Sequence, residues 1–155
     1  MKNMRRKDKK IEDRREIESI IERANVCRIG LCDEGVPYIV PLVFGYKNSC
    51  LYFHSATEGK KIEIIRKTDT ACFEIDIDKE LVKAEDACSF SMKYRSIIGF
   101  GEIQIVDDTK EKIEALNTIM SHYTEENFQY PKESLQNVAV IKIKIEEMTG
   151  KKSGY

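Results

Sequence analysis

The segment His54-Ser55-Ala56-Thr57-Glu58-Gly59-Lys60-Lys61 combines a histidine, two hydroxyl groups and two lysines, which are side chains suited to binding an anion. Ser55 followed by Glu58 has the form of a capping box, which predicts that a short helix begins here, directly after an aromatic strand. The unpaired N–H groups at a helix N-terminus suit a phosphate, and Lys60 or Lys61 would neutralise its remaining charge. The alternative is that Ser55 caps a surface helix and that both lysines are solvated.

His54 ends the aromatic run Leu51-Tyr52-Phe53, beside the predicted anion site. A histidine in this position could act as a general acid or base, contact a cofactor or ligate a metal. No partner at a suitable spacing accompanies it, which argues against a metal, and a hydrogen bond to backbone is the structural alternative. The other histidine, His122, is interpreted as a surface residue or as a cation at a helix C-terminus.

Two other segments could contribute to a binding surface. Pro41 interrupts the apolar run from Ile39 to Phe44 and removes one ladder donor, which is typical of an edge strand, a bulge or backbone turned toward a ligand. A simple kink in the strand is the alternative. Tyr94, Arg95 and Ser96 form a basic and hydroxyl-bearing start to a strand, which could bind phosphate, face a partner subunit or only carry surface charge.

The order of the predicted elements indicates a mainly β protein with helices. Helical spacing predicts helices that begin near Asp13, Ser55, Asp108 and Pro131. Six β-branched and aromatic runs predict six mostly antiparallel strands, and Gly99 and Gly101 indicate a bulge or bend in the fifth. Six strands in a chain of this length favour closure into a small β-barrel with three to four flanking helices. Residues 1–155 show no repeat or linker, so we expect one domain.

Composition narrows the class of protein. The 26 Lys and Arg residues nearly balance the 27 Asp and Glu residues, so nucleic acid is not an expected partner, and residues 1–10 are only a local basic patch. No signal peptide and no apolar run long enough to span a membrane are present, which predicts a cytoplasmic protein without a membrane partner. The odd number of cysteines, five without a C-x-x-C pair, indicates reduced thiols in or beside the core.

Taken together, several segments resemble the pyridoxamine 5'-phosphate oxidase-like family of split β-barrel flavoproteins, and within it the 5-nitroimidazole resistance (Nim-type) branch. They are MRRKDKKI, GVPYIVPLVFGY, LYFHSATEGKK, ACFEID and MKYRSIIGFGE, followed by the terminal IEEMTGKK. The resemblance therefore extends over nearly the whole chain. The tail TGKKSGY lacks the arginine-rich C-terminal segment of the true pyridoxamine 5'-phosphate oxidases, which argues against oxidation of vitamin B6.

This resemblance implies a six-stranded FMN-binding split barrel that forms a homodimer, with two FMN sites between the subunits. It implies that Val40, Pro41 and Leu42 lie along the flavin ring, that Ser55, Lys60 and Lys61 hold the phosphate end, and that the partner's copies of Tyr94, Arg95 and Ser96 approach the same cofactor. It also implies that His54 lies beside the flavin. FAD could bind through the same phosphate end.

The resemblance leads to a working hypothesis of an FMN-dependent oxidoreductase that passes electrons from a reductant to a small molecule such as a nitroaromatic, with His54 donating a proton. No glycine-rich dinucleotide fingerprint is present, so a reduced nicotinamide would dock only transiently. One alternative is a flavin-binding or redox-sensing module without turnover. Another is a haem protein with His54 as axial ligand.

Overall fold

The computed structural model describes residues 5–155, so the first four residues of the predicted domain and of the basic patch lie outside the described residues. The strands are β1 (Lys10–Ile11), β2 (Cys27–Asp33), β3 (Val36–Leu42), β4 (Gly45–Lys47), β5 (Cys50–Ser55), β6 (Thr70–Val82), β7 (Ser91–Ile105) and β8 (Ala139–Ser153). The helices are α1 (Arg14–Arg23), α2 (Lys60–Ile65), α3 (Thr109–Ser121) and α4 (Lys132–Gln136), with short 3₁₀ turns at Lys7–Lys9 and Ala87–Ser89.

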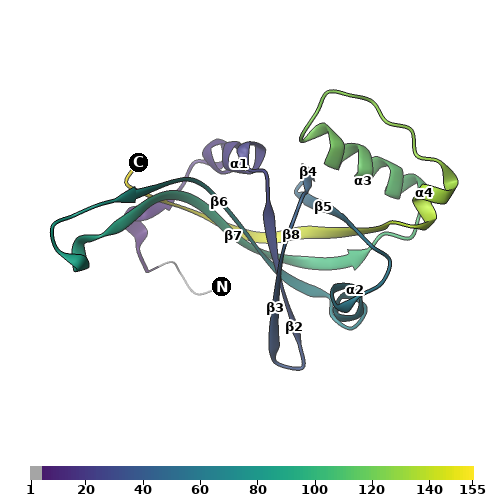
Figure 1. Ribbon diagram of the computed structural model, residues 1–155, viewed down its shortest axis with the longest axis horizontal. Helices are drawn as coiled ribbons and strands as arrows, with labels where there is room; N and C mark the ends of the chain where they lie inside the picture. Colours follow the sequence, from purple (N-terminus) through teal and green to yellow (C-terminus); the bar gives the residue numbers. More distant parts are fainter. Residues whose placement is uncertain (1–4) are drawn as a thin grey trace.

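One antiparallel sheet contains all eight strands, in the order β3-β2-β6-β7-β8-β5-β4, with β1 paired to the far end of β8 (Figure 1). The prediction of a mainly β fold with four helices is confirmed, but the count of six strands is too low. The apolar run that we interpreted as one strand splits into β3 and β4, and β1 adds a further two-residue strand. Within the described residues no ladder joins the terminal strands β3 and β4, so the structure does not show the predicted closure into a barrel.

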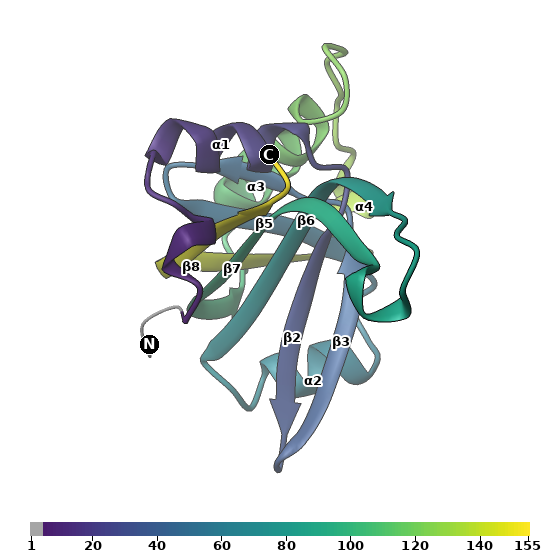
Figure 2. The ribbon, with the colours of Figure 1, turned by 90° about the vertical axis from the view of Figure 1, so that its left-hand side faces the viewer.

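Two apolar clusters hold the sheet to its helices. The larger one packs α1 and α2 onto one face of the sheet, where Phe53, Phe73 and Ile97 are fully buried. The smaller one packs α3 and α4 over β5 and β8 through Leu116, Leu135 and Val140. Helices therefore cover part of each face, and the segment of the sheet formed by β3, β2, β6 and β7 has one face without a helix. Figure 2 views this face, with α2 behind β2 and β3.

Local sequence signals explain several of these elements. The side chain of Asp13 caps α1 by accepting a hydrogen bond from the Arg15 N–H at 2.8 Å, and Asp108 caps α3 by accepting one from the Glu111 N–H. Pro41 lies in the terminal strand β3, where a proline removes no bond from a second neighbour. A register shift between Phe100 and Gly101 confirms the predicted bulge in β7.

The cysteines differ from the expectation. All five are free thiols, but only Cys27 is buried, while Cys32 and Cys88 are exposed. The reason is that strand residues alternate between faces, so a cysteine inside an apolar run can still point outward. None of the helices in residues 5–155 has the length and apolar character that crossing a membrane requires.

Candidate functional site

The predicted anion-binding segment connects the end of β5 to the start of α2. His54 and Ser55 are the last two residues of β5, and the side chain of His54 is exposed. The predicted capping box is wrong, because Ser55 remains in the strand and α2 begins at Lys60 without a side-chain cap. Gly59 precedes the helix at φ +111°, a backbone conformation that glycine adopts readily. The helix has only six residues, so the lysines, rather than the helix dipole, are the main source of positive charge here.

The two lysines have different surroundings. Lys60 is exposed, and its Nζ lies 5.7 Å from the centre of the Tyr38 ring, which links α2 to β3. Lys61 is half-buried, and its burial lowers the pKa of the amine. Within residues 5–155, no carboxylate forms an ion pair with Lys61 and no acceptor forms a hydrogen bond with it. A partly desolvated ammonium group without a counter-ion is suited to a bound anion.

The three residues predicted to line a flavin ring do not share a face. Val40 and Leu42 pack against the larger apolar cluster, whereas Pro41 is exposed. Ile39, with 68% of its surface exposed, lies on the same side as Pro41. The alternation of a strand therefore leaves Ile39 and Pro41 as the outward apolar surface of β3.

Tyr94, Arg95 and Ser96 lie inside β7 rather than at its start, and they also alternate. Ser96 shares its face with Asp76 and Lys151, and the Tyr94 ring lies 5.4 Å from the Lys151 amine. Arg95 points to the opposite side. There its guanidinium donates to Asp78 at 2.7 Å and lies 3.7 Å from Glu16, and the Tyr155 ring packs against it with its centre 4.1 Å away. Arg95 is therefore fully engaged within its own chain.

The structure thus joins some of the predicted site residues and separates others. The segment 54–61 and β3 are connected through Lys60 and Tyr38. Residues 94–96 are elsewhere on the sheet, and no hydrogen bond, ion pair or ring contact within the described residues joins them to either segment. The distance between β3 and β7 follows from four residues that lie opposite one another on neighbouring strands: Pro41, Arg28, Glu74 and Ile98. Three strand spacings of ~4.8 Å separate Pro41 on β3 from Ile98 on β7.

Sequence reasoning missed Arg28, which lies in this row. Its Nη1 donates to Glu74 at 3.1 Å and to Asp76 at 2.6 Å. Burial and the neighbouring Asp76 raise the pKa of Glu74. Burial also acts to raise the pKa of Asp76, but hydrogen bonds from Lys79 and Arg28 outweigh it and lower that pKa. The sequence VCRIGLC contained a signal for Arg28, because a charged residue between two apolar, inward-facing strand positions must face outward.

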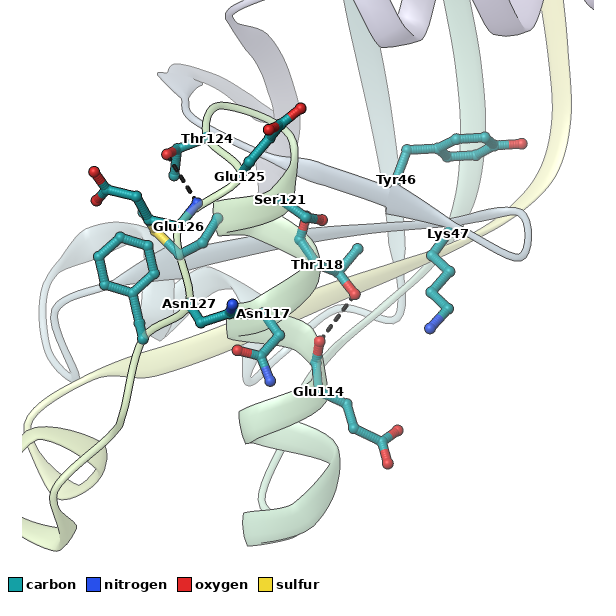
Figure 3. Close-up of a pocket in the computed structure, with 12 residues that line it drawn as sticks. Tyr46, Lys47, Glu114, Asn117, Thr118, Ser121, Thr124, Glu125, Glu126 and Asn127 are labelled. Atoms are coloured by element: carbon teal, nitrogen blue, oxygen red, sulfur yellow. Dashed lines mark hydrogen bonds between the residues drawn. The ribbon is translucent and has the colours of Figure 1, made fainter.

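A cavity of about 640 Å³ lies elsewhere, between β4, α3 and residues 124–128 (Figure 3). Its lining is polar, and Figure 3 shows Tyr46 and Lys47 on one side with Glu125 and Glu126 on the other, their side chains directed away from one another. The hydroxyl groups of Thr118 and Ser121 already donate to carbonyls of α3. None of the predicted cofactor residues lines this cavity, so we do not assign the cofactor to it.

The chain thus combines an eight-stranded antiparallel sheet with a pair of lysines at the start of α2. A family model described as pyridoxamine 5'-phosphate oxidase matches residues 13–152, and the chain belongs to this family. No curated protein matches the sequence at a significant level.

Three solved structures show the range of relatives. The "putative 5-nitroimidazole antibiotic resistance protein" of Bacteroides thetaiotaomicron is 42% identical, with a TM-score of 0.82 over 92% of this chain and 85% of that one. The flavocytochrome Anf3 of Azotobacter vinelandii is 20% identical, with a TM-score of 0.85 over 99% and 73%. An FAD-binding protein of Mesorhizobium loti is 21% identical, with a TM-score of 0.66 over 92% and 96%. The two distant relatives support the fold alone.

The residues present fit a flavin phosphate. Lys61 supplies a half-buried cation to which no described carboxylate is paired, and Ser55 and Lys60 supply further donors in the same segment. The exposed pair Ile39 and Pro41 supplies an apolar surface of the kind that a planar ring requires. By contrast, within residues 5–155 no group of three or more His, Cys, Asp or Glu side chains is arranged to hold a metal ion.

Proposed function

We propose that the protein is an FMN-binding oxidoreductase that reduces a small oxidised molecule such as a nitroaromatic, with electrons from a reduced nicotinamide or another reductant. The observation that carries this proposal is the half-buried Lys61, unpaired within residues 5–155, at the β5–α2 junction of a chain that belongs to the pyridoxamine 5'-phosphate oxidase family. The name of the Bacteroides relative supports a nitroaromatic as the acceptor. FAD remains a second candidate cofactor, because its flavin would bind through the same phosphate end.

Each residue has a definite task in this proposal. Lys61 and Lys60 bind the phosphate through charge-assisted hydrogen bonds, and the Ser55 hydroxyl donates a further one. Pro41 and Ile39 pack against one side of the ring system and exclude water from it. The bound flavin supplies the transfer of electrons between reductant and acceptor. His54 is exposed at the end of β5, where a protonated ring nitrogen can deliver a proton to the acceptor.

The proposal includes a homodimer built on the face without a helix. Apolar side chains are exposed there at Ile39, at Ile98 (45%) and, toward the turn between β6 and β7, at Leu81 and Met92. An exposed apolar surface that extends over several strands is typical of a subunit contact. Tyr94 and Ser96 lie on this face and Arg95 does not, so Tyr94 and Ser96 are the residues proposed to approach the partner's cofactor.

A titration with FMN tests the proposed binding. The visible spectrum and the quenching of flavin fluorescence are recorded as FMN is added to the purified protein, with light scattering to give the mass. We expect one FMN per subunit and a dimer. A protein that binds neither FMN nor FAD at micromolar concentrations would contradict the proposal, and a Soret band in the purified protein would replace it with a haem site.

Turnover is tested separately from binding. The bound flavin is reduced under anaerobic conditions, and its reoxidation by a nitroimidazole is followed by stopped flow. We expect reoxidation that depends on the acceptor concentration, and a slower rate in His54→Ala with unchanged FMN affinity. Reoxidation that does not respond to the acceptor would favour a flavin-binding module without turnover.

A further inference from the structure

Arg28 lies at the centre of the face without a helix, directly opposite Pro41 in the register of β2 and β3. Directly opposed residues in antiparallel strands have Cβ atoms about 4.5–5.5 Å apart, so a molecule packed against Pro41 lies within reach of the Arg28 side chain. The Arg28 side chain is 41% exposed. No other cation is opposite a residue of β3 in this register, which extends from Cys27 to Asp33.

The orientation of Arg28 is fixed by two acids on the neighbouring strand. Its Nη1 donates to Asp76 at 2.6 Å and to Glu74 at 3.1 Å. Asp76 is in turn held by the amine of Lys79 at 2.7 Å. The guanidinium carries five N–H donors, and both hydrogen bonds use the same nitrogen. Nε and Nη2 form no hydrogen bond within the described residues, so their donors are held in place and available.

The charge of this cluster shows what kind of contact it can make. Arg28 and Lys79 contribute two positive charges, and Glu74 and Asp76 contribute two negative charges, so the four groups together are close to neutral. A neutral cluster provides little attraction for an anion at a distance. The cluster suits an uncharged, planar hydrogen-bond acceptor. The guanidinium of an arginine holds its N–H donors in a fixed plane, which matches the directed hydrogen bonds that such an acceptor requires.

We propose that Arg28 is a further flavin-binding residue, which donates hydrogen bonds to the carbonyl-bearing polar edge of the ring system packed against Pro41. Asp76 and Glu74 act as positioning residues for this arginine. This inference rests on the proposed flavin site and adds to it a contact at the opposite end of the cofactor from Lys60 and Lys61. Because β3 is a terminal strand of the sheet, the ring can lie over its outer face against Pro41 and Arg28 while the phosphate reaches the β5–α2 segment around the free edge of β3.

The test compares Arg28→Gln and Arg28→Lys with the wild type in the FMN titration. Arg14→Gln is the matched control, since Arg14 is also ion-paired, at 3.1 Å to Glu18, but lies on α1 away from this face. Both Arg28 variants should bind FMN about tenfold more weakly or worse, because each loses directed hydrogen bonds. The flavin bands at saturating FMN should also shift in wavelength, because these bands respond to hydrogen bonds at the ring. Asp76→Asn should show the same shift to a smaller extent.

Each outcome decides between the alternatives. A dimeric Arg28→Gln protein with weaker FMN binding and a shifted spectrum supports the inference. Unchanged affinity and spectrum, with the wild type binding FMN normally, would overturn the inference and leave the proposed function intact. Weaker binding that only follows the loss of the dimer in both variants would also overturn it, because Arg28 would then act on the subunit contact. A wild type that binds no flavin would overturn the proposed function together with the inference.

Discussion

The segments around Lys61 and around Arg95 look alike in the sequence, since each combines basic and hydroxyl-bearing side chains at the edge of an apolar run. In the structure the two cations differ in whether they have ion-pair partners. Lys61 is half-buried and has no counter-ion among residues 5–155. Arg95 is bound to Asp78 and Glu16 and covered by the Tyr155 ring. A cation without a partner is available to a ligand, whereas a cation with every partner in place stabilises the fold. The partners, rather than the residue type, separate a binding site from a structural network.

The largest expected effect on FMN affinity comes from removing the two lysines at the start of α2. The double variant Lys60→Ala/Lys61→Ala should lose about 100-fold or more in FMN affinity, because two charge-assisted hydrogen bonds to phosphate are removed. Its thermal unfolding temperature without FMN should be no lower than that of the wild type. The measurement is a fluorescence titration, with Lys110→Ala, at an exposed position of α3, as the control for removing a lysine. Wild-type affinity in the double variant would show that the phosphate binds elsewhere.

Removing an acid from the Arg95 network should have the reverse effect. Asp78 accepts hydrogen bonds from Arg95 and also from Arg23, the latter at 2.5 Å. Asp78→Asn should lower the free energy of unfolding by about 1–2 kcal/mol, between the values for exposed and buried ion pairs, since these groups are only partly covered. Asparagine is the appropriate replacement because residue 78 has φ +56°, which asparagine tolerates. FMN affinity should not change.

A change in FMN affinity without a loss of stability in Asp78→Asn would mean that the network serves the cofactor site. Urea unfolding followed by circular dichroism gives the stability, and the FMN titration of the same preparation gives the affinity. The truncation of Tyr155 provides a second route to the same comparison, because its hydroxyl donates to the Asp78 carbonyl at 2.8 Å.

The pH dependence of FMN binding should report on Lys61. Burial lowers the pKa of this amine, so it loses its proton at a pH below the ordinary lysine value of 10.5. FMN affinity should therefore fall severalfold as the pH rises through this lowered pKa, and Lys61→Arg should keep its affinity to higher pH. An affinity that stays constant up to pH 10.5 would contradict the assignment of Lys61 to the phosphate.

The smallest expected effect is that of the Lys61 charge on the stability of the protein without FMN. Because the folded-state pKa of Lys61 lies below that of the unfolded chain, its charge costs stability at neutral pH, and this cost disappears as the pH rises past 10.5. Lys61→Met should therefore unfold at a slightly higher temperature than the wild type at pH 7, and the difference should vanish at high pH. A lower unfolding temperature for Lys61→Met would indicate that the amine has a stabilising partner.

The sequence by itself determined the class of fold, the four helices and the location of the basic segment after His54. These follow from local physics: strand and helix periodicity, the caps at Asp13 and Asp108, and the glycine at the bulge of β7, Gly101, where a Cβ would meet the backbone of Lys144. The short strands β1 and β4 escaped prediction, because two or three residues are too few for a periodic signal and their pairing depends on β8 and β5.

Only the tertiary structure decided which neighbours in the chain share a face and which charges have partners. Val40 and Leu42 turned inward while Pro41 turned outward, and Tyr94 and Ser96 separated from Arg95, because adjacent residues of a strand point to opposite sides. Asp78 and Arg95 are 17 residues apart, and Arg28 and Asp76 are 48 apart, so their pairing depends on strand register. In the part of the chain that the structure describes, no acid pairs with Lys61, which is a property of the packed chain and of no single segment.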